Sequence, residues 1–333
     1  MVRTMLLKTR SPILAVLKHW LGGFSLALLP FSAMAEVYSM PPPNSDLIGE
    51  IQYTKARHED TLIDIAREFS LGQDEIVMAN PKVDRWLPGE GKQVLVPRQF
   101  ILPDAPRKGI VLNIPEMRLY YFPGGPKTPA TQVITYPVSI GRMDWRTPLG
   151  ATRVIKKVTD PTWTPPETIK REHAQDGDIL PDVVPAGPLN PLGKFAMKLG
   201  VPGYLIHGTG VDKAYGIGMR VTHGCIRMYP EDIEKLYPLI SVGTSVYLVN
   251  QPVKLGWADG TLYIEVSQPL DEDRMTYEQL LSLAMGLIEK KIATQQVLLD
   301  GAALKKALQE PSGIPVAISK PAEIAAPDPL PPF

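Results

Sequence analysis

Short apolar segments separated by turns dominate the middle of the chain. They cover residues 110–114, 118–122, 132–140 and 152–158, and the turns between them include Pro123-Gly124-Gly125 and Pro148-Leu149-Gly150. Short strands at this spacing, without long helices between them, predict a β-sandwich or β-barrel. Further strands are expected at 204–206 and 244–249, so we assign residues 110–250 to a mainly β domain. The 35 prolines and 27 glycines of the chain also disfavour a helical bundle.

Residues 160–194 interrupt this strand pattern with a long segment rich in proline and glycine. Loops of this length in a compact domain are usually functional, and many of them are lids. A helix is expected at 230–239, with Pro230 at its first position and Glu231 and Asp232 in its first turn.

The first 35 residues have the composition of an export signal. Four basic residues precede an apolar run at 20–31, no acidic residue occurs before Glu36, and Ala33-Met34-Ala35 provides a cleavage site. A membrane anchor is the alternative, but the run is shorter than the ~20 apolar residues that a span requires. We therefore predict a cleaved signal peptide at 1–35. The mature chain then has 31 basic and 35 acidic residues, a net charge of −4 that argues against nucleic-acid binding.

A small α+β segment is expected at residues 49–98, between linkers at 36–48 and 99–109. Its predicted order is strand, helix, helix, strand (βααβ). Asp60 is expected to cap a first helix that begins at Thr61, and Asp74 to cap a second helix that ends before Pro81. The buried face of the first helix is expected to carry Leu62, Ile65, Ala66 and Phe69.

A partly helical extension is expected at residues 251–310. A hairpin at 255–266 would turn through Asp259-Gly260, and helices are expected at 276–292 and 302–309. The last segment, 311–333, has seven prolines and is expected to be a disordered tail.

Cys225 is the single cysteine of the chain, which excludes a disulfide framework and a multi-cysteine zinc site. In an oxidising compartment a lone cysteine is either buried and inert or kept as a reactive thiol. Two of the five histidines, His207 and His223, lie within the same short window. An imidazole in hydrogen-bond reach generates the reactive thiolate, and Gly224 permits a tight turn whose backbone N–H groups can stabilise an oxyanion.

A zinc site is the main alternative interpretation of this window. His207, His223 and Cys225 could form a three-ligand catalytic set, as in a zinc-dependent peptidoglycan hydrolase. No HExxH-like helix and no ligating acid accompany them, so we favour a cysteine enzyme that needs neither a metal nor an organic cofactor.

Residues 49–98 resemble a LysM domain. The matching residues are Tyr53-Thr54, Glu59-Asp60-Thr61-Leu62, Ile65-Ala66, Phe69, Asn80-Pro81, Pro88-Gly89 and Val96-Pro97. The resemblance implies binding of the N-acetylglucosamine-containing glycan of peptidoglycan. A protein that binds the cell wall without catalysis is therefore a third hypothesis.

Residues 110–250 resemble the YkuD-type L,D-transpeptidase catalytic domain. The family pattern, a histidine and some fifteen residues later Ser/Thr-His-Gly-Cys, is matched by His207 and by Thr222-His223-Gly224-Cys225. The resemblance implies a YkuD-type β-sandwich or barrel. The order of signal, LysM-like segment and catalytic domain is similar to that of Gram-negative periplasmic members, so a periplasmic location is implied.

The family mechanism then implies roles for individual residues. Cys225 would attack the diaminopimelate carbonyl of a tetrapeptide stem and expel the terminal D-alanine. His207 would be the base, oriented by a carbonyl near Gly208, and His223 would orient the substrate and the thiolate. The amides of Gly224 and Cys225 would hold the oxyanion. An amine acceptor would resolve the thioester, which gives either a 3→3 cross-link or an outer-membrane lipoprotein attached to peptidoglycan.

Four residues are weaker candidates for substrate binding: Thr222, Arg227, Tyr204 and Trp163. Thr222 occupies the Ser/Thr position of the family pattern, and Trp163 lies in the long segment 160–194. Arg227 stands where many members have asparagine. It either pairs with a carboxylate of the stem peptide or forms a structural salt bridge.

Overall fold

The computed structural model describes residues 36–125, 128–293 and 297–321. The predicted signal peptide and residues 322–333 of the predicted tail lie outside these ranges. Among the described residues, no helix has the length and apolar character needed to cross a membrane.

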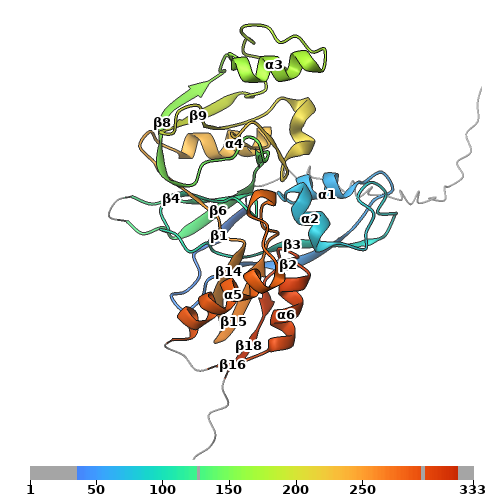
Figure 1. Cartoon of the computed structure of the whole chain (residues 1–333), viewed down its shortest axis with the longest axis vertical. Coiled ribbons are helices and arrows are strands. Elements are labelled where there is room, and N and C mark those ends of the chain that lie inside the picture. The colour runs from blue at the N-terminus through green and yellow to red at the C-terminus, as the bar shows by residue number, and fades with distance from the viewer. Residues whose placement is uncertain (1–35, 126–127, 294–296, 322–333) are drawn as a thin grey trace, which may run out of the picture. The chain divides into compact units, whose positions relative to one another are not determined.

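A nine-stranded sheet forms the centre of the fold (Figure 1). Its strands in spatial order are β1 (Glu36–Ser39), β6 (Gln132–Pro137), β5 (Arg118–Phe122), β4 (Gly109–Asn113), β13 (Ser245–Val249), β8 (Gly150–Thr159), β9 (Phe195–Leu199), β10 (Leu205–His207) and β12 (Ile226–Arg227). Neighbours are antiparallel except β4 with β13 and β10 with β12, which are parallel. A third parallel pair, outside this sheet, joins β7 (Ile140–Gly141) to β11 (Arg220–Thr222). The mainly β fold predicted from the sequence is confirmed.

Strands β4 and β5 are buried on both faces, which explains their nearly continuous apolar sequences. Ile110 and Leu112 face one core, which also contains residues of β9, β10 and β12. Val111, Tyr120 and Phe122 face a second core. Each side of the sheet therefore has a packed apolar layer.

The second core is shared with the βααβ module, which has the predicted order of elements. Its elements are β2 (Leu47–Lys55), α1 (Leu62–Glu68), α2 (Gln73–Ala79) and β3 (Gln93–Ile101), and β2 pairs with β3 along nine residues. The predicted caps are wrong. Thr61 caps α1, because its hydroxyl accepts from the Asp64 N–H, whereas Asp60 accepts from Arg57. Gly72, not Asp74, precedes α2 as its cap.

Both segments expected to be linkers contain regular structure. Residues 36–39 form β1 and pair with β6, because a sheet edge offers them backbone partners. Strand β3 continues to Ile101, and Leu102 is buried. The module is thus packed on the nine-stranded sheet. The Gln73 N–H donates to Ile217 O at 3.0 Å, and Arg67 forms two hydrogen bonds with Glu231 at 2.8 and 3.0 Å.

The C-terminal extension forms a third core (Figure 1). The predicted hairpin is β14 (Val253–Ala258) and β15 (Thr261–Val266), and the predicted helices are α5 (Tyr277–Ile292) and α6 (Gly301–Gln309). The expected disorder of 311–333 is wrong for residues 316–321. These form β17 (Val316–Ala317) and β18 (Ser319–Pro321), which pair with β15 and β16 (Val297–Leu299), and Ile318 between them is fully buried.

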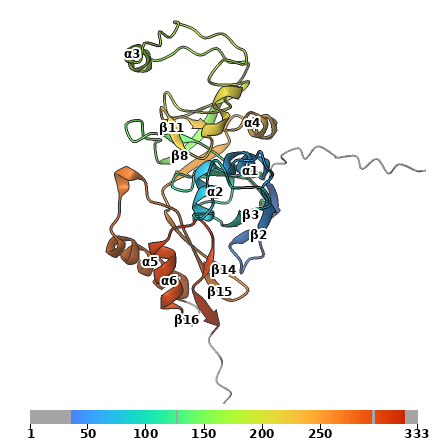
Figure 2. The same ribbon diagram turned by 90° about the vertical axis from the view of Figure 1, so that its right-hand side faces the viewer.

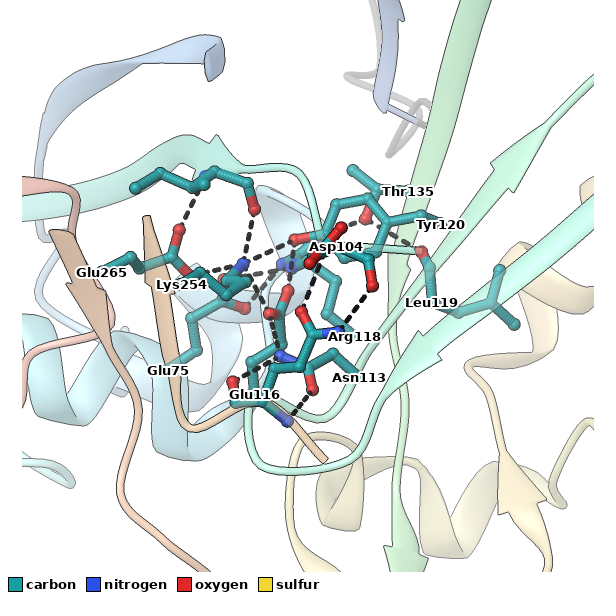
Figure 3. A network of polar contacts seen from close by, with 12 residues as sticks. Glu75, Asp104, Asn113, Glu116, Arg118, Leu119, Tyr120, Thr135, Lys254 and Glu265 are labelled. Atoms are coloured by element: carbon teal, nitrogen blue, oxygen red, sulfur yellow. Dashed lines mark hydrogen bonds and ion pairs between the residues drawn. The ribbon is translucent and has the colours of Figure 1, made fainter. Parts of the chain in front are cut away.

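A buried network of charges joins the three parts of the molecule (Figure 3). Lys254 of β14 pairs with Glu116 at 2.6 Å and with Glu265 of β15 at 2.8 Å, and it donates to Ile101 O of β3 at 2.7 Å. All three charged side chains are at most 7 % exposed. Burial opposes the charge of Lys254, but the two carboxylates outweigh it and raise the Lys254 pKa. Nearby, Arg118 of β5 pairs with Glu75 of α2 at 2.6 Å.

The long segment 160–194 lies between β8 and β9 and contains a helix, α3 (Glu167–Gln175), that the weak periodicity did not predict. We call residues 160–194 the excursion, and Figure 2 shows α3 at its outer end. The remaining elements are η1 (Val211–Gly216), α4 (Pro230–Leu236), η2 (Tyr237–Leu239) and η3 (Asp271–Asp273). Pro230 is the first residue of α4, as predicted.

Candidate active site

Strands β10 and β12 bring the two ends of the sequence motif together. They are parallel neighbours, with Ile206 opposite Ile226 and His207 opposite Arg227. Side chains alternate along a strand, so His207 and Arg227 share a face of the sheet with Cys225, which immediately precedes β12. The thiol, the imidazole and the guanidinium therefore belong to one small region at the edge of the large sheet.

The turn before β12, residues 222–225, is called here the Cys225 turn. It requires glycine at position 224, because φ is +98° and an added Cβ would lie 2.8 Å from Cε1 of Tyr204. Two hydroxyl groups hold the turn: Thr222 Oγ1 donates to Cys225 O at 2.6 Å, and Thr147 Oγ1 donates to Gly224 O at 2.9 Å. Two of the predicted residues therefore shape the turn: Thr222 through its hydrogen bond to Cys225 O, and Tyr204 through its ring, which lies against Gly224.

The thiol of Cys225 is partly exposed and lies at the start of β10. It donates to Gly203 O at 3.6 Å, and the Leu205 N–H hydrogen-bonds to the sulfur. Burial raises the pKa of the Cys225 thiol, and the Leu205 N–H and the positive charge of Arg227 oppose this shift only in part. The resting thiol is therefore protonated at neutral pH.

The imidazole of His207 is buried, with 4 % of the residue exposed. Its Nδ1 is 2.6 Å from Gly208 O, and since a carbonyl can only accept, Nδ1 carries the proton and Nε2 has the free lone pair. Burial and the charge of Arg227 lower the His207 pKa to about 3. His207 is therefore a neutral base with a defined tautomer.

The expectation of a thiolate held beside an imidazole is wrong for this resting state. Burial disfavours the charged forms of both groups, so a neutral thiol faces a neutral imidazole. Within the described ranges, no hydrogen bond joins the sulfur to His207. Both groups are therefore uncharged in the resting protein.

Gly208 fixes the end of the strand that carries His207. Its N–H donates to Phe195 O of β9 at 3.1 Å, and an added Cβ would approach Cγ2 of Ile233 in α4 to 2.9 Å. On the other side, the Met228 N–H donates to His207 O at 2.9 Å. The strand end that carries His207 is thus held by the sheet and by α4.

His223 has partners that the sequence did not predict. Its Nε2 lies 3.1 Å from Glu172 Oε2 of α3, and its ring packs edge to face on Trp145 at 5.2 Å between centroids. Glu172 also accepts from Arg142 Nη2 at 2.7 Å. Glu172 and Arg142 carried no signal in the sequence, since both are far from the motif along the chain, Glu172 in a helix that was not predicted and Arg142 in a loop.

Arg227 forms no ion pair within the described part of the chain, so the structural salt bridge considered for it is absent there. Its backbone pairs with Ser139 at 2.8 and 3.0 Å, while its side-chain Nε is buried without a hydrogen-bond partner among the described residues. Burial lowers the pKa of this guanidinium. Trp163 lies elsewhere, at the base of the excursion, where its backbone pairs with Val184 at 2.7 and 2.9 Å.

The three proposed zinc ligands are not assembled. Among the residues with a described position, no group of three or more His, Cys, Asp or Glu side chains could hold a metal ion. Nδ1 of His207 is bonded to a carbonyl and Nε2 of His223 to a carboxylate.

A cavity of about 270 Å³ lies behind the Cys225 turn. It is lined by Gly141 and Thr147, which contact the turn, by Arg146 next to Thr147, and by Arg220 and Glu272 from two other segments. Arg220 and Glu272 satisfy each other with hydrogen bonds of 2.7 and 2.8 Å. Cys225 does not line this cavity.

Comparison with known proteins identifies the same region of the chain as a catalytic domain. A family model described as the L,D-transpeptidase catalytic domain, YkuD, matches residues 107–248. The chain is 37 % identical over 327 residues to "Probable L,D-transpeptidase YcfS" of Escherichia coli, covering 95 % of this chain and 98 % of that protein. It is 39 % identical to two further Escherichia coli proteins, "Probable L,D-transpeptidase ErfK/SrfK" over 306 residues and "Probable L,D-transpeptidase YbiS" over 303 residues. These matches cover 90 % of this chain and 96 % and 97 % of those proteins.

Proposed function

The chain belongs to the L,D-transpeptidase family that carries a YkuD catalytic domain, and on this premise we propose that Cys225 transfers a peptidoglycan stem peptide to an amine. The donor is a tetrapeptide stem. The observation that carries the proposal is the neutral His207, whose Nδ1 is committed to Gly208 O, on the same face of the sheet as the thiol.

The first half-reaction forms a thioester. The sulfur attacks the diaminopimelate carbonyl carbon, and its proton passes to Nε2 of His207. The oxyanion accepts hydrogen bonds from the amides of Gly224 and Cys225, a role that suits the left-handed conformation at Gly224. The bond from this carbonyl to D-alanine then breaks, and the departing nitrogen takes the proton from His207.

The second half-reaction reverses these roles. An amine attacks the thioester carbonyl, His207 takes a proton from it, and Cys225 leaves as a thiolate that recovers the proton. A second diaminopimelate side chain as acceptor gives a 3→3 cross-link, and a lysine of an outer-membrane lipoprotein gives attachment to the wall. Muropeptide analysis of a strain that carries only this enzyme distinguishes these two acceptors.

Arg227 has two roles in this proposal. Its charge favours the thiolate of Cys225, which assists loss of the thiol proton, and it keeps the resting His207 neutral, with the Nε2 lone pair free to accept that proton. Its Nε has no hydrogen-bond partner among the described residues, so we also assign its guanidinium to a carboxylate of the stem peptide. The half-buried position of the guanidinium strengthens both interactions.

We also propose glycan binding by the βααβ module and export of the chain to the periplasm. The residue pattern of a LysM domain supports the first, together with Tyr53 and Trp86, which are 61 % and 59 % exposed on this module. Such aromatic side chains offer apolar faces to a sugar. The composition of residues 1–35 supports the second.

Replacement of the nucleophile tests the proposed reaction. We expect Cys225→Ala to abolish transfer on a disaccharide-tetrapeptide and to leave the fold intact, and a chelator to have no effect on the natural enzyme. Mass spectrometry of the products and of the intact protein after carbapenem treatment makes the measurement. Full activity of the variant, or loss of activity with the chelator, contradicts the proposal. A natural protein that neither transfers nor forms a covalent adduct is a wall-binding protein instead.

A further inference from the structure

The excursion reaches the Cys225 turn through one carboxylate. Oε1 of Glu172 accepts from Arg142 at 2.7 Å, and Oε2 lies 3.1 Å from Nε2 of His223. Within the described residues, Glu172 is the one side chain of α3 that hydrogen-bonds outside the excursion, since Lys170 and His173 bond to residues inside it. Helix α3 is therefore joined to the turn at a single point.

Arg142 and Trp145 complete a frame around the His223 ring. The Arg142 N–H donates to Thr222 O at 3.0 Å, so the backbone of Arg142 is bonded to the residue before His223. The Trp145 ring packs edge to face on the imidazole. The ring is thus held between a carboxylate of α3 and an indole, two residues before the nucleophile.

The charges around His223 favour this arrangement. The groups that face it are Glu172 and His173 from α3 and Arg142 from the opposite segment. Burial lowers the His223 pKa, and the bond to Glu172 opposes that shift in part. The hydrogen bond from Arg142 lowers the pKa of Glu172, so this carboxylate is ionised at neutral pH and accepts from both partners.

We propose that Glu172 is a positioning residue for acyl transfer: it holds His223, and with it the Cys225 turn, in the orientation used for attack. The inference rests on the proposed function of Cys225. His223 is then oriented from the excursion, and the excursion is ordered against the turn by the same carboxylate. Glu172 touches neither the sulfur nor the base, so its effect on the reaction is transmitted through His223.

Charge removal at Glu172 tests this inference. We expect Glu172→Gln to lower the rate of Cys225 acylation by about tenfold, the range for losing a hydrogen bond to a charged group. The matched control is Glu167→Gln, which removes an exposed carboxylate from the same helix and should leave the rate unchanged. In a His223→Asn background, Glu172→Gln should have no further effect, because the partner is already gone.

Titration of His223 by NMR gives a readout that does not depend on activity. Glu172→Gln should lower the His223 pKa, since a negative charge that stabilises the imidazolium is lost, and Arg142→Gln should raise it. Both variants should slow acylation, because both break the frame. Opposite pKa shifts with the same loss of rate would not result from general destabilisation.

The outcomes separate this inference from the proposed function. An unchanged acylation rate and an unchanged His223 pKa in Glu172→Gln would overturn the positioning role while transfer by the natural enzyme stands. If the natural enzyme transfers nothing, the proposed function fails, and a His223 pKa that Glu172→Gln leaves unshifted would also refute the contact. If Glu172→Gln does not fold, Arg142→Gln tests the same inference, because it removes the other hydrogen-bond partner of the Glu172 carboxylate.

Discussion

Burial has opposite effects on the pKa values of Cys225 and His207, and both effects favour the neutral form. The thiol pKa rises, while the imidazole pKa falls to about 3. An ion pair at rest would need to overcome both shifts. In the proposed mechanism, a neutral pair keeps Cys225 protonated until a substrate carbonyl arrives, when the developing oxyanion and the imidazolium can stabilise each other.

Arg227 offers a prediction that separates charge from geometry. Arg227→Gln should raise the pH midpoint of Cys225 alkylation, because the positive charge that favours the thiolate is removed. Arg227→Lys keeps the charge and should keep that midpoint. It loses bidentate geometry, so the donor KM should rise by about tenfold. Alkylation rates against pH and steady-state kinetics make the two measurements. A midpoint that does not move in Arg227→Gln would contradict the electrostatic role.

The residues of the site differ in how far the sequence could predict them. Cys225, His207 and Gly224 were predictable because the chemistry needs a thiol, a base and a flexible turn within one short window. Glu172, Arg142 and Thr147 were not, because they reach the Cys225 turn from segments that are about 50 to 80 positions away along the chain. The protonation states of Cys225 and His207 could not be predicted from the sequence either, because they depend on burial.

At the scale of an element, the Cys225 turn depends on Gly224. In Gly224→Ala, the added Cβ meets the Tyr204 ring and φ lies in the left-handed region, so the turn must move. A displacement of about 1 Å can cost roughly 100-fold in rate, and we expect a loss of that order in kcat.

Gly243→Ala is the control for this variant. Gly243 has φ +94° but no atom within 4 Å of an added Cβ, so its substitution carries the backbone strain without the collision. It should lower stability by about 1 kcal/mol and leave kcat unchanged. Equal kinetic losses in the two variants would mean that Gly224 acts only through general strain.

Elements with strong periodicity were predictable, and short ones were not. Strands β4, β5 and β13 and helices α5 and α6 follow their patterns within one or two residues. Strands β11 and β12 have three and two residues, too few for a period to show, although they hold the site. Both N-terminal caps were misplaced because several neighbouring residues could cap, and only the folded backbone selects Thr61 and Gly72.

At the scale of the whole molecule, the family and the enzyme class predicted from the motif are confirmed by the comparisons. The way the parts are joined was not predictable. One apolar core combines Leu62 and Ile76 of the βααβ module with Val111 and Phe122 of the catalytic sheet. A sequence pattern predicts that such apolar faces are buried, but it does not predict which element packs against them. The parts are therefore layers of one folded body.

The last prediction concerns how this body unfolds. Lys254 is the cation of the buried network, and Lys254→Met leaves Glu116 and Glu265 without it. Removing one partner of a buried ion pair typically costs about 3–5 kcal/mol, and we expect a loss of that order. Because β3, the catalytic sheet and the C-terminal hairpin all meet at Lys254, calorimetry should show one transition that moves to lower temperature as a whole.

Two controls make this measurement decisive. Lys194→Met removes an exposed lysine whose partner, Glu234, is also exposed, so it should change stability by less than about 1 kcal/mol. The triple variant Glu116→Gln, Lys254→Met, Glu265→Gln removes the uncompensated charges and should recover part of the loss. If Lys254→Met instead splits the unfolding into separate transitions, the βααβ module, the sheet and the extension are independent domains, and the shared core does not couple them.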